Sequence, residues 1–354
     1  MVISIQDNDI NFQNILQGKL TNAFMMLSTK SFHLDTHSDS ANAIVNNVKF
    51  SLGHINSIPN GFKFDTTVQR VFDVFILKLT RTLPYKKTMP DSDWKKYQCV
   101  SITLKEYMDL CQIKNRLRAV EQIKNALNLI NRIHVEFTDT RFISKKKTES
   151  IYYYFNITDS VVRKKGRGIY SIFFNIEFLK YLAQSYIMPF PLKLLQVNLK
   201  HYPHVYSLGR RLFLHKNMNY NKSNSEIISI KSLLESVSTL PTYDEIKSTG
   251  RIKQRIIEPL EETFKFLVEL NILSEWHYRS EKIDYNYEEW SNLYVIFRVK
   301  DYPMRQKKVD LTPSNEGSNN DNQMRRLRPK NDKLRPKNDT LRPKSDISRL
   351  RMLI

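Results

Sequence analysis

Apolar residues recur at helical spacing through the stretch 250–270, and polar residues fill the positions between them. A spacing of three and four residues predicts an amphipathic helix with one buried face. Pro259 lies inside this pattern and has no amide hydrogen to donate, so we predict one continuous helix that bends at the proline. The buried stripe comprises Ile252, Ile256, Ile257, Leu260, Phe264, Leu267 and Leu270, and the opposite face carries Arg251, Gln254, Arg255 and Glu258.

The segments around this helix form a pattern that occurs twice in the chain. In each copy an amphipathic helix precedes a short helix, a long helix and a strand. The first copy places these elements at 65–81, 103–111, 114–131 and 133–137, and the second at 203–217, 229–237, 250–270 and 272–276. Thr103 and Glu106 have the spacing of a capping box, and Ser229 can cap the matching helix. We interpret the repetition as an internal duplication.

After the first long helix, the apolar pattern changes to a period of two, which predicts antiparallel strands at 134–137, 151–157 and 169–176. Both connections between these strands are basic. One contains Lys145, Lys146 and Lys147, and the other contains Arg163, Lys164 and Lys165. A charged run is often only a solvated turn, but both runs are placed as wings beside the long helix would be.

These elements predict an α+β protein with two tandem winged-helix domains and a disordered basic C-terminal tail. We place an N-terminal polar arm or helix at 1–60, winged-helix domains at 61–188 and 189–303, and the tail at 304–354. Within the first domain we expect Leu117, Val120, Ile123, Leu127 and Ile130 to face the core. We also expect a loop at 82–97, a hinge at Pro189 and Pro191, and a polar aromatic loop at 285–290.

The formal net charge of +20 points to an anionic partner, either nucleic acid or a membrane surface. No apolar run approaches the roughly 20 residues of a membrane-spanning helix. The apolar run 23–27 is too short for a signal-peptide core and has no basic residues before it, so we expect no secretory leader and a cytoplasmic protein. Cys99 and Cys111 have neither metal-ligand spacing nor a disulfide pattern, and Cys111 falls on an apolar helix face.

Enzyme motifs are scarce: phosphate-binding, dinucleotide-binding and serine-hydrolase signatures are all missing. We therefore expect no catalytic residue, no metal and no cofactor. The one catalytic alternative is a strand-nicking transferase that uses His201, His204 and Tyr206. His201 and His204 are three residues apart and separated by Pro203. This spacing does not suit two ligands on one strand, and a helix-entry loop explains the residues as well.

The two long helices are the candidate DNA-reading elements, because a helix with a basic and amide-rich face fits the major groove. Basic wings would add phosphate contacts. The candidate DNA-binding residues are Lys114, Asn115, Arg118, Gln122, Asn125, Arg251, Gln254 and Arg255 on the helices, and Lys145, Lys146, Lys147, Arg163, Lys164 and Lys165 in the wings.

The duplicated pattern, with the kinked helix that begins Arg251-Ile-Lys-Gln-Arg-Ile-Ile-Glu-Pro259 and leads directly into a strand, resembles the replication initiators of iteron-containing bacterial plasmids. The resemblance spans about 65–303. It implies binding to repeated origin DNA, origin opening, and recruitment of a host initiator and helicase. It leaves a homodimer open. We expect no membrane partner. A rolling-circle nickase and a winged-helix transcription repressor are the alternatives from other functional classes.

The tail contains a seven-residue repeat that begins at Leu327, Leu334 and Leu341. A proline in each unit excludes a coiled coil. Seven codons are 21 base pairs, about two turns of DNA at about 10.5 per turn, so the coding DNA could itself carry binding sites. A basic linker expanded by slippage is the alternative.

Overall fold

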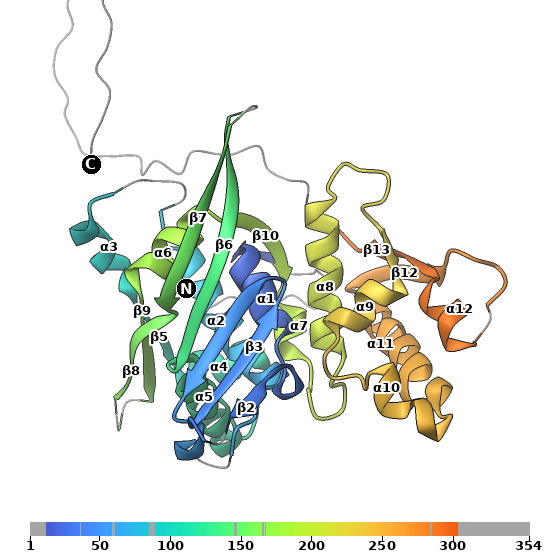
Figure 1. The fold of residues 1–354 in the computed structure, drawn as a ribbon, viewed down its shortest axis with the longest axis horizontal. Coiled ribbons are helices and arrows are strands. Elements are labelled where there is room, and N and C mark those ends of the chain that lie inside the picture. Colours follow the sequence, from blue (N-terminus) through green and yellow to red (C-terminus); the bar gives the residue numbers. More distant parts are fainter. Residues whose placement is uncertain are drawn as a thin grey trace, which may run out of the picture. The chain divides into compact units, whose positions relative to one another are not determined.

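The computed structural model describes residues 12–303, apart from 36, 59–60, 85–88, 145–146, 165, 167 and 284. Two segments within this range have the same order of elements (Figure 1). The first contains α2 (Thr66–Thr80), β5 (Cys99–Thr103), α4 (Leu104–Cys111), α5 (Arg116–Ile130), β8 (Thr158–Lys164) and β9 (Ile169–Phe174). The second contains α8 (Val205–Met218), β11 (Ile227–Ser229), α9 (Ile230–Ser236), α11 (Glu258–Glu269), β12 (Leu273–Tyr278) and β13 (Tyr294–Val299).

The sheets of the two segments also match. The strand orders are β5-β9-β8 and β11-β13-β12, and all neighbouring strands are antiparallel. In each sheet the strand before the short helix pairs with the last strand, which lies in the middle. A helix, a strand, two helices and a closing hairpin constitute a winged helix. The predicted α+β fold with tandem winged helices is confirmed, and the predicted disordered tail lies outside the described residues.

Helix caps begin these helices where the sequence predicts them. The Asp65 side chain accepts hydrogen bonds from the backbone N–H groups of Thr67 and Val68 at the start of α2. Thr103 and Glu106 form the predicted capping box of α4. The Ser229 hydroxyl caps α9 by accepting from the N–H of Ser232. These bonds satisfy donors that a helix N-terminus leaves free.

The N-terminal segment is more ordered than the polar arm or single helix expected there. It contains β1 (Phe12–Gln17), α1 (Lys19–Met26), β2 (His33–Asp35), β3 (Ser40–Val45) and β4 (Val48–Gly53), with 3₁₀ turns at Thr29–Ser31 and Ile55–Ser57. The helix α1 packs into the core, where Phe24 stacks on Phe72 of α2 with ring centroids 4.2 Å apart. The segment therefore belongs to the folded core rather than to an arm.

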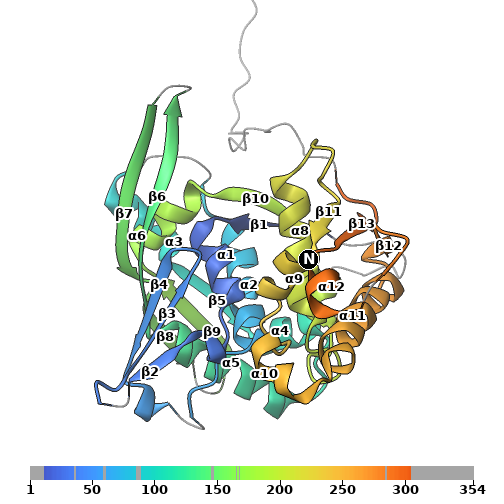
Figure 2. The ribbon, with the colours of Figure 1, turned by 45° about the vertical axis from the view of Figure 1, so that its right-hand side comes forward.

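The two basic connections belong to different sheets, which the sequence analysis did not anticipate. The strands β6 (Ile133–Ser144) and β7 (Lys147–Asn156) join β2, β3 and β4 in a five-stranded sheet of order β2-β3-β4-β6-β7. In both ribbon views the β6–β7 hairpin extends away from α5 (Figures 1 and 2). The strand β8, which the sequence analysis missed, forms the other hairpin with β9, and this hairpin lies near α4 and α5.

Three predicted loops contain regular structure. The helix α3 (Asp91–Gln98) lies in the predicted loop 82–97 and buries Trp94. The predicted hinge at Pro189 and Pro191 is the strand β10 (Tyr186–Pro191), which pairs with β1. Prolines two residues apart turn their nitrogens to the same edge, so neither removes a donor from this pairing. The helix α12 (Tyr287–Ser291) occupies the predicted aromatic loop and buries Trp290.

The remaining elements lie between the two segments or within the second one. The helix α6 (Ile176–Ala183) leads into β10, and α7 (Lys193–Gln196) leads toward α8. The helix α10 (Tyr243–Ile246) and a 3₁₀ turn at Lys247–Thr249 precede α11. Among the described residues, no helix is long and apolar enough to cross a membrane.

Buried charged side chains join α2 to α8. The Arg210 Nε lies 2.9 Å from Asp73 Oδ2, and the Tyr206 hydroxyl donates to the same oxygen at 2.5 Å. Asp73 is 1 % exposed and Arg210 is 4 % exposed. Burial raises the pKa of Asp73 to about 6, against the opposing effects of Arg210 and Tyr206. This is an ion pair in the interior rather than on the surface.

A second buried arginine joins α2 to both α5 and the segment after α7. Arg70 Nη1 donates to the backbone carbonyls of Leu195 and Val197, at 3.2 and 3.0 Å. Its Nη2 donates to Gln122 Oε1 at 3.2 Å. One buried guanidinium thus fixes α2, α5 and the chain near 196 to one another.

Candidate nucleic-acid interface

The helix α5 presents a polar and basic face to solvent. The Asn115 side chain caps its first turn by accepting a hydrogen bond from the N–H of Arg118 at 3.0 Å. Of the predicted residues on this helix, Lys114, Asn115, Arg118 and Asn125 are exposed. Arg116 and Lys124 are exposed on the same helix and were not among the predicted residues, although a helical wheel places them on this face.

Leu117 corrects the predicted core of this helix. The apolar pattern assigned Leu117 to the buried stripe, yet it is 81 % exposed. Ile123, Leu127 and Ile130 are buried as predicted, and Val120 is half-buried. The periodicity of apolar residues predicts which face of the helix a side chain lies on. It does not predict how far along the helix other elements cover that face. Ala119 in the same turn is buried, but no described element covers the side of the first turn that carries Leu117, so Leu117 lies in solvent.

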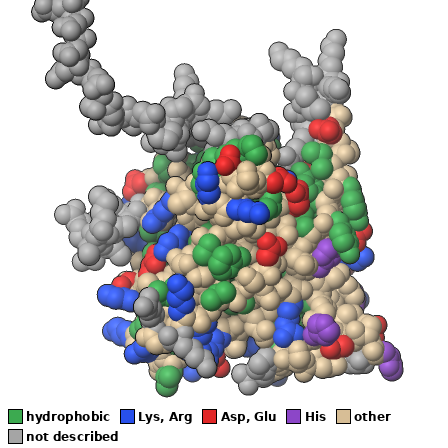
Figure 3. Space-filling model, turned by 90° about the vertical axis from the view of Figure 1, so that its left-hand side faces the viewer, with side chains coloured by type: hydrophobic (Ala, Val, Ile, Leu, Met, Phe, Trp, Pro, Cys, Tyr) green, Lys and Arg blue, Asp and Glu red, His purple; other side chains and the backbone are tan. Residues whose placement is uncertain are grey.

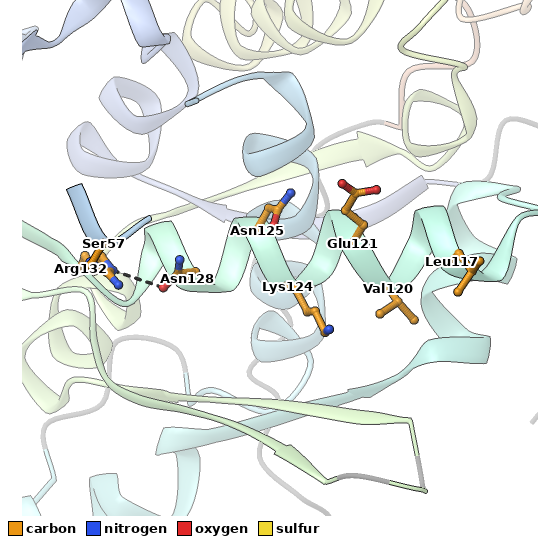
Figure 4. Close-up of a pocket in the computed structure, with 8 residues that line it drawn as sticks. All are labelled: Ser57, Leu117, Val120, Glu121, Lys124, Asn125, Asn128 and Arg132. Carbon is orange, nitrogen blue, oxygen red and sulfur yellow. Dashed lines mark hydrogen bonds between the residues drawn. The ribbon is translucent and has the colours of Figure 1, made fainter. Parts of the chain in front are cut away.

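A groove runs along α5 beside this first turn. Figure 4 shows Val120 and Lys124 on one side of the helix and Glu121 and Asn125 on the other. At the far end, Arg132 donates to the carbonyl of His54 and to Ser57 Oγ, which fixes the 3₁₀ turn against the end of α5. The full lining is Ser57, Leu117, Val120, Glu121, Lys124, Asn125, Asn128 and Arg132.

Gln122 differs from the other predicted residues because its acceptor atom is already engaged. Its Oε1 accepts from the Tyr107 hydroxyl at 3.1 Å and from Arg70 Nη2 at 3.2 Å. A glutamine that reads adenine uses its oxygen and its nitrogen together. In this arrangement Gln122 offers only its amide hydrogens to DNA, so it can donate to a base or phosphate but cannot make the paired adenine contact.

The second long helix has a π-turn where the sequence predicts a bend. Residues Lys253–Ile257 have π-helical bonding and continue directly into α11. The N–H of Glu258 donates to the carbonyl of Lys253, five residues back. Pro259 cannot donate to the carbonyl of Arg255, and its ring would crowd that carbonyl in a regular α-helix. The wider turn relieves this conflict.

The predicted outer face of this helix is exposed. Arg251, Gln254, Arg255 and Glu258 all lie in solvent, while Ile256, Ile257, Leu260, Phe264 and Leu267 are buried. Ile252 and Leu270 are half-buried.

Aromatic side chains support the start of the second long helix. The Lys253 ammonium lies 5.2 Å from the centre of the Tyr285 ring. Tyr243 of α10 stacks on Tyr287 of α12, with ring centroids 4.0 Å apart and an interplanar angle of 8°. These contacts hold the connection between β12 and β13 against α10 and the π-turn.

The β8–β9 hairpin carries the described part of the basic wing. Arg163 and Lys164 are exposed near the end of β8, and the Arg163 guanidinium lies 5.8 Å from the centre of the Tyr170 ring. The N–H of Leu104 donates to the carbonyl of Gly168 at 2.7 Å, which holds the hairpin against the start of α4. Gly168 has a φ of +59°, a conformation that glycine adopts without strain.

The remaining wing residues are only partly visible. Lys145, Lys146 and Lys165 lie outside the described residues, and the structure does not describe the side chain of Lys147. The described ends of β6 and β7 extend away from α5 (Figure 1). The expectation that Lys145, Lys146 and Lys147 flank this helix falls outside the described side chains and stays a prediction. Lys and Arg side chains are spread over the face that Figure 3 shows, interrupted by a hydrophobic patch.

The residues of the nickase alternative do not form an accessible site. Tyr206 is fully buried, its hydroxyl donates to Asp73, and burial raises its pKa. His204 Nδ1 lies 2.7 Å from Thr239 Oγ1, and burial lowers the pKa of His204 to about 4. Among the described residues, no group of three or more His, Cys, Asp or Glu could hold a metal ion. Tyr206 therefore cannot reach a DNA backbone in this structure.

A family comparison identifies the first winged helix. Residues 41–195 match the family described as "Initiator Replication protein, WH1", where WH1 denotes the first winged helix. Residues 41–195 are thus similar to the first winged helix of replication initiators. This confirms the resemblance that the sequence suggested.

Solved structures of initiator proteins are also similar to the chain. A Pi initiator protein in complex with iteron DNA is 14% identical, with a TM-score of 0.44, and the match covers 72% of this chain and 98% of that one. Domains 2 and 3 of RctB are 10% identical, with a TM-score of 0.39, and the match covers 78% and 91%. No curated protein sequence matches the chain. The assignment above rests on the family match.

Proposed function

We propose that the protein is a plasmid replication initiator that binds repeated double-stranded DNA at an origin, promotes its opening and recruits a helicase. The observation that carries this proposal is α5, a capped helix of a replication-initiator winged helix. Its solvent face bears Arg116, Arg118 and Lys124 beside the basic β8–β9 hairpin, and the exposed Lys114 directly precedes its N-cap. Double-stranded DNA is the partner that fits a basic helix of this kind, and the proposal places it in the cytoplasm, where plasmid DNA is found.

The proposal gives the two long helices the same task. Each would enter the major groove of part of a repeat, and Arg118, Arg251 and Arg255 would donate to base edges. Arg163 and Lys164 would contact phosphate and so set the register of the protein on the duplex. We propose domain boundaries close to 61–188 and 189–303. A host initiator, a helicase and a second copy of the chain are the proposed protein partners.

No covalent step on DNA is part of this proposal, and the burial of Tyr206 supports its omission. A rolling-circle nickase with another tyrosine is tested by incubating the protein with supercoiled origin plasmid and Mg²⁺ or Mn²⁺. A covalent protein–DNA adduct would establish the nickase. A transcription repressor would bind the same repeats, but it would not support replication of a plasmid that carries only the repeats and the gene.

The central experiment is selection of bound duplexes from a random library with the full chain. We expect a defined sequence to be enriched, and we expect direct copies of it near the gene. Failure to enrich any sequence would overturn the proposed function.

We predict that Ala at Arg118, Arg251 or Arg255 weakens binding to the selected sequence by about 1–3 kcal/mol and relaxes specificity at one base position. Loss of a guanidinium that donates to a base removes discrimination at that base. Selection with each variant measures the effect, and Lys95→Ala, on the exposed face of α3, is the control. Equal weakening on selected and random DNA would show that the arginine binds only phosphate.

We predict that Ala at both Arg163 and Lys164 lowers the slope of log K against log salt by about 0.9 for each phosphate that the hairpin no longer neutralises. Each neutralised phosphate releases condensed cations, so the slope reports how many phosphates the protein binds. Fluorescence anisotropy between 50 and 200 mM salt, the range over which this dependence is strong, gives the slope. Lys95→Ala with Lys200→Ala removes the same charge from other exposed positions and serves as the control. A slope that matches the wild type would make the hairpin an ordinary solvated turn.

A further inference from the structure

The most exposed large apolar side chain among the described residues lies at the start of the proposed reading helix. Leu117 is 81 % exposed, the highest value for any large hydrophobic residue that the structure describes. It is the second residue of α5, directly between the exposed side chains of Arg116 and Arg118. A leucine this exposed contributes nothing to the core, so its side chain is free to contact a partner.

The surroundings of Leu117 indicate what that partner is. Val120, one turn further along α5, is half-buried and lines the same groove. Around these two apolar residues lie Arg116, Arg118 and Lys124, against the single carboxylate of Glu121. Two apolar side chains surrounded by basic ones suit double-stranded DNA. The basic side chains can meet the phosphates on both edges of the groove, and the apolar ones can meet the few apolar groups on its floor.

The major groove has one apolar group that varies with sequence, the C5-methyl of thymine. In a helix-turn-helix protein the N-terminal residues of the recognition helix approach the base edges most closely. Leu117 occupies that part of α5, whereas Lys124 and Asn125 lie two turns later. The leucine side chain has no hydrogen-bond donor or acceptor, so it cannot bond to a base edge. It can pack against a methyl group.

We infer that Leu117 is a specificity-determining residue that packs against a thymine methyl group, with Val120 forming the second wall of the contact. This inference rests on the proposed function, since it assigns a base preference to the DNA-reading face of α5. It adds an apolar contact to a site where the sequence analysis proposed only charged and amide side chains.

The test uses the duplex selected with the full chain. Each thymine in turn is replaced by uracil, which removes the methyl group and keeps every hydrogen-bonding atom. Wild type and Leu117→Ala are then compared on each duplex by anisotropy. Leu117 is exposed, so its replacement leaves the core intact, and circular dichroism verifies the fold.

At one thymine we expect uracil to weaken wild-type binding about fourfold, which corresponds to about 0.8 kcal/mol for a methyl group removed from its contact. At the same position uracil should have a clearly smaller effect on Leu117→Ala, because only the Val120 side of the contact remains. Elsewhere the two proteins should respond alike. Replacing this base pair by C·G should weaken wild-type binding, and 5-methylcytosine should restore part of the loss.

Met218→Ala, at an exposed apolar residue of α8, is the matched control and should keep the full uracil effect. If uracil weakens the binding of wild type and of Leu117→Ala by the same factor at every thymine, the inference is overturned and the proposed function stands. Unchanged DNA binding by Leu117→Ala together with a loss of self-association in sedimentation would also overturn it and make the surface a protein contact. Failure to select any duplex would overturn the proposed function itself, and the inference with it.

Discussion

Replacing Asp73 with alanine is expected to lower the free energy of unfolding by about 3–5 kcal/mol, the usual cost of breaking a buried ion pair from one side. The reason is the guanidinium that remains. Arg210 is 4 % exposed, and its Nε lies 2.9 Å from the Asp73 carboxylate. The change also leaves the buried Tyr206 hydroxyl without its acceptor. Urea denaturation followed by circular dichroism measures the loss.

The double replacement Asp73→Leu with Arg210→Met separates this explanation from a simple packing defect. It removes both charges, so it should recover most of the lost stability. The exposed pair of Lys105 and Asp109 gives the matched surface control, where Asp109→Ala should cost at most about 0.5 kcal/mol. A loss below about 1 kcal/mol for Asp73→Ala would show that water reaches Arg210 and that the pair is not a buried one.

The same carboxylate makes stability depend on pH. Burial raises the pKa of Asp73 to about 6 from an ordinary value of 3.8. Between these values the folded protein holds a proton that the unfolded chain has released, so stability decreases as pH rises. The contribution is complete below about pH 4 and is lost as pH passes through 6. Relative to Asp73→Asn, which does not titrate, the wild type should therefore become less stable over this range.

The second large effect is expected at Arg70. Arg70→Ala should cost about 3–5 kcal/mol, because it leaves two buried backbone carbonyls without donors at about 1–3 kcal/mol each and removes the bond to Gln122. Hydrogen exchange should also rise in the chain around Leu195 and Val197. Denaturation and exchange mass spectrometry measure the two outcomes.

Arg70→Lys is the informative companion. An ammonium keeps the charge, but it cannot reach two carbonyls and an amide as the planar guanidinium does. It should recover only part of the stability. Full recovery by lysine would mean that charge alone, rather than the three-way bond, stabilises the contact between α2, α5 and the chain near 196.

Local signals in the sequence predicted the elements that local chemistry determines. The capping box of Thr103 and Glu106 and the caps at Asp65 and Ser229 are interactions within one turn, so the sequence contains all of their partners. The long helices have enough turns for their period to be unambiguous. The duplication follows from these same elements, which is why the winged-helix fold could be predicted.

Features that depend on distant partners could not be predicted in this way. Leu117 has the spacing of a core residue, but no described element covers its side of the first turn of α5, so it is exposed. The strand β2 has three residues and no apolar alternation, and it exists because β3 lies beside it. The basic runs near 146 and 165 look alike in sequence, yet they close hairpins of different sheets. The amide of Gln122 has the hydrogen-bonding groups of a base-reading residue, but its oxygen already accepts hydrogen bonds from Arg70 and Tyr107.

The π-turn at Lys253–Ile257 changes how the second long helix can diverge between related proteins. A π-turn holds about one residue more than an α-turn, and each residue of an α-helix advances the direction of the side chain by about 100°. Arg251 therefore has an angular phase, relative to the buried Leu260 and Phe264, that an uninterrupted helix would not give it. Loss of a single residue in this turn would rotate the side chains that precede it, Arg251 among them, while Leu260, Phe264 and Leu267 of α11 stayed in place. An insertion or deletion of one residue here can thus redirect the exposed side chains at the start of the helix without changing how α11 packs.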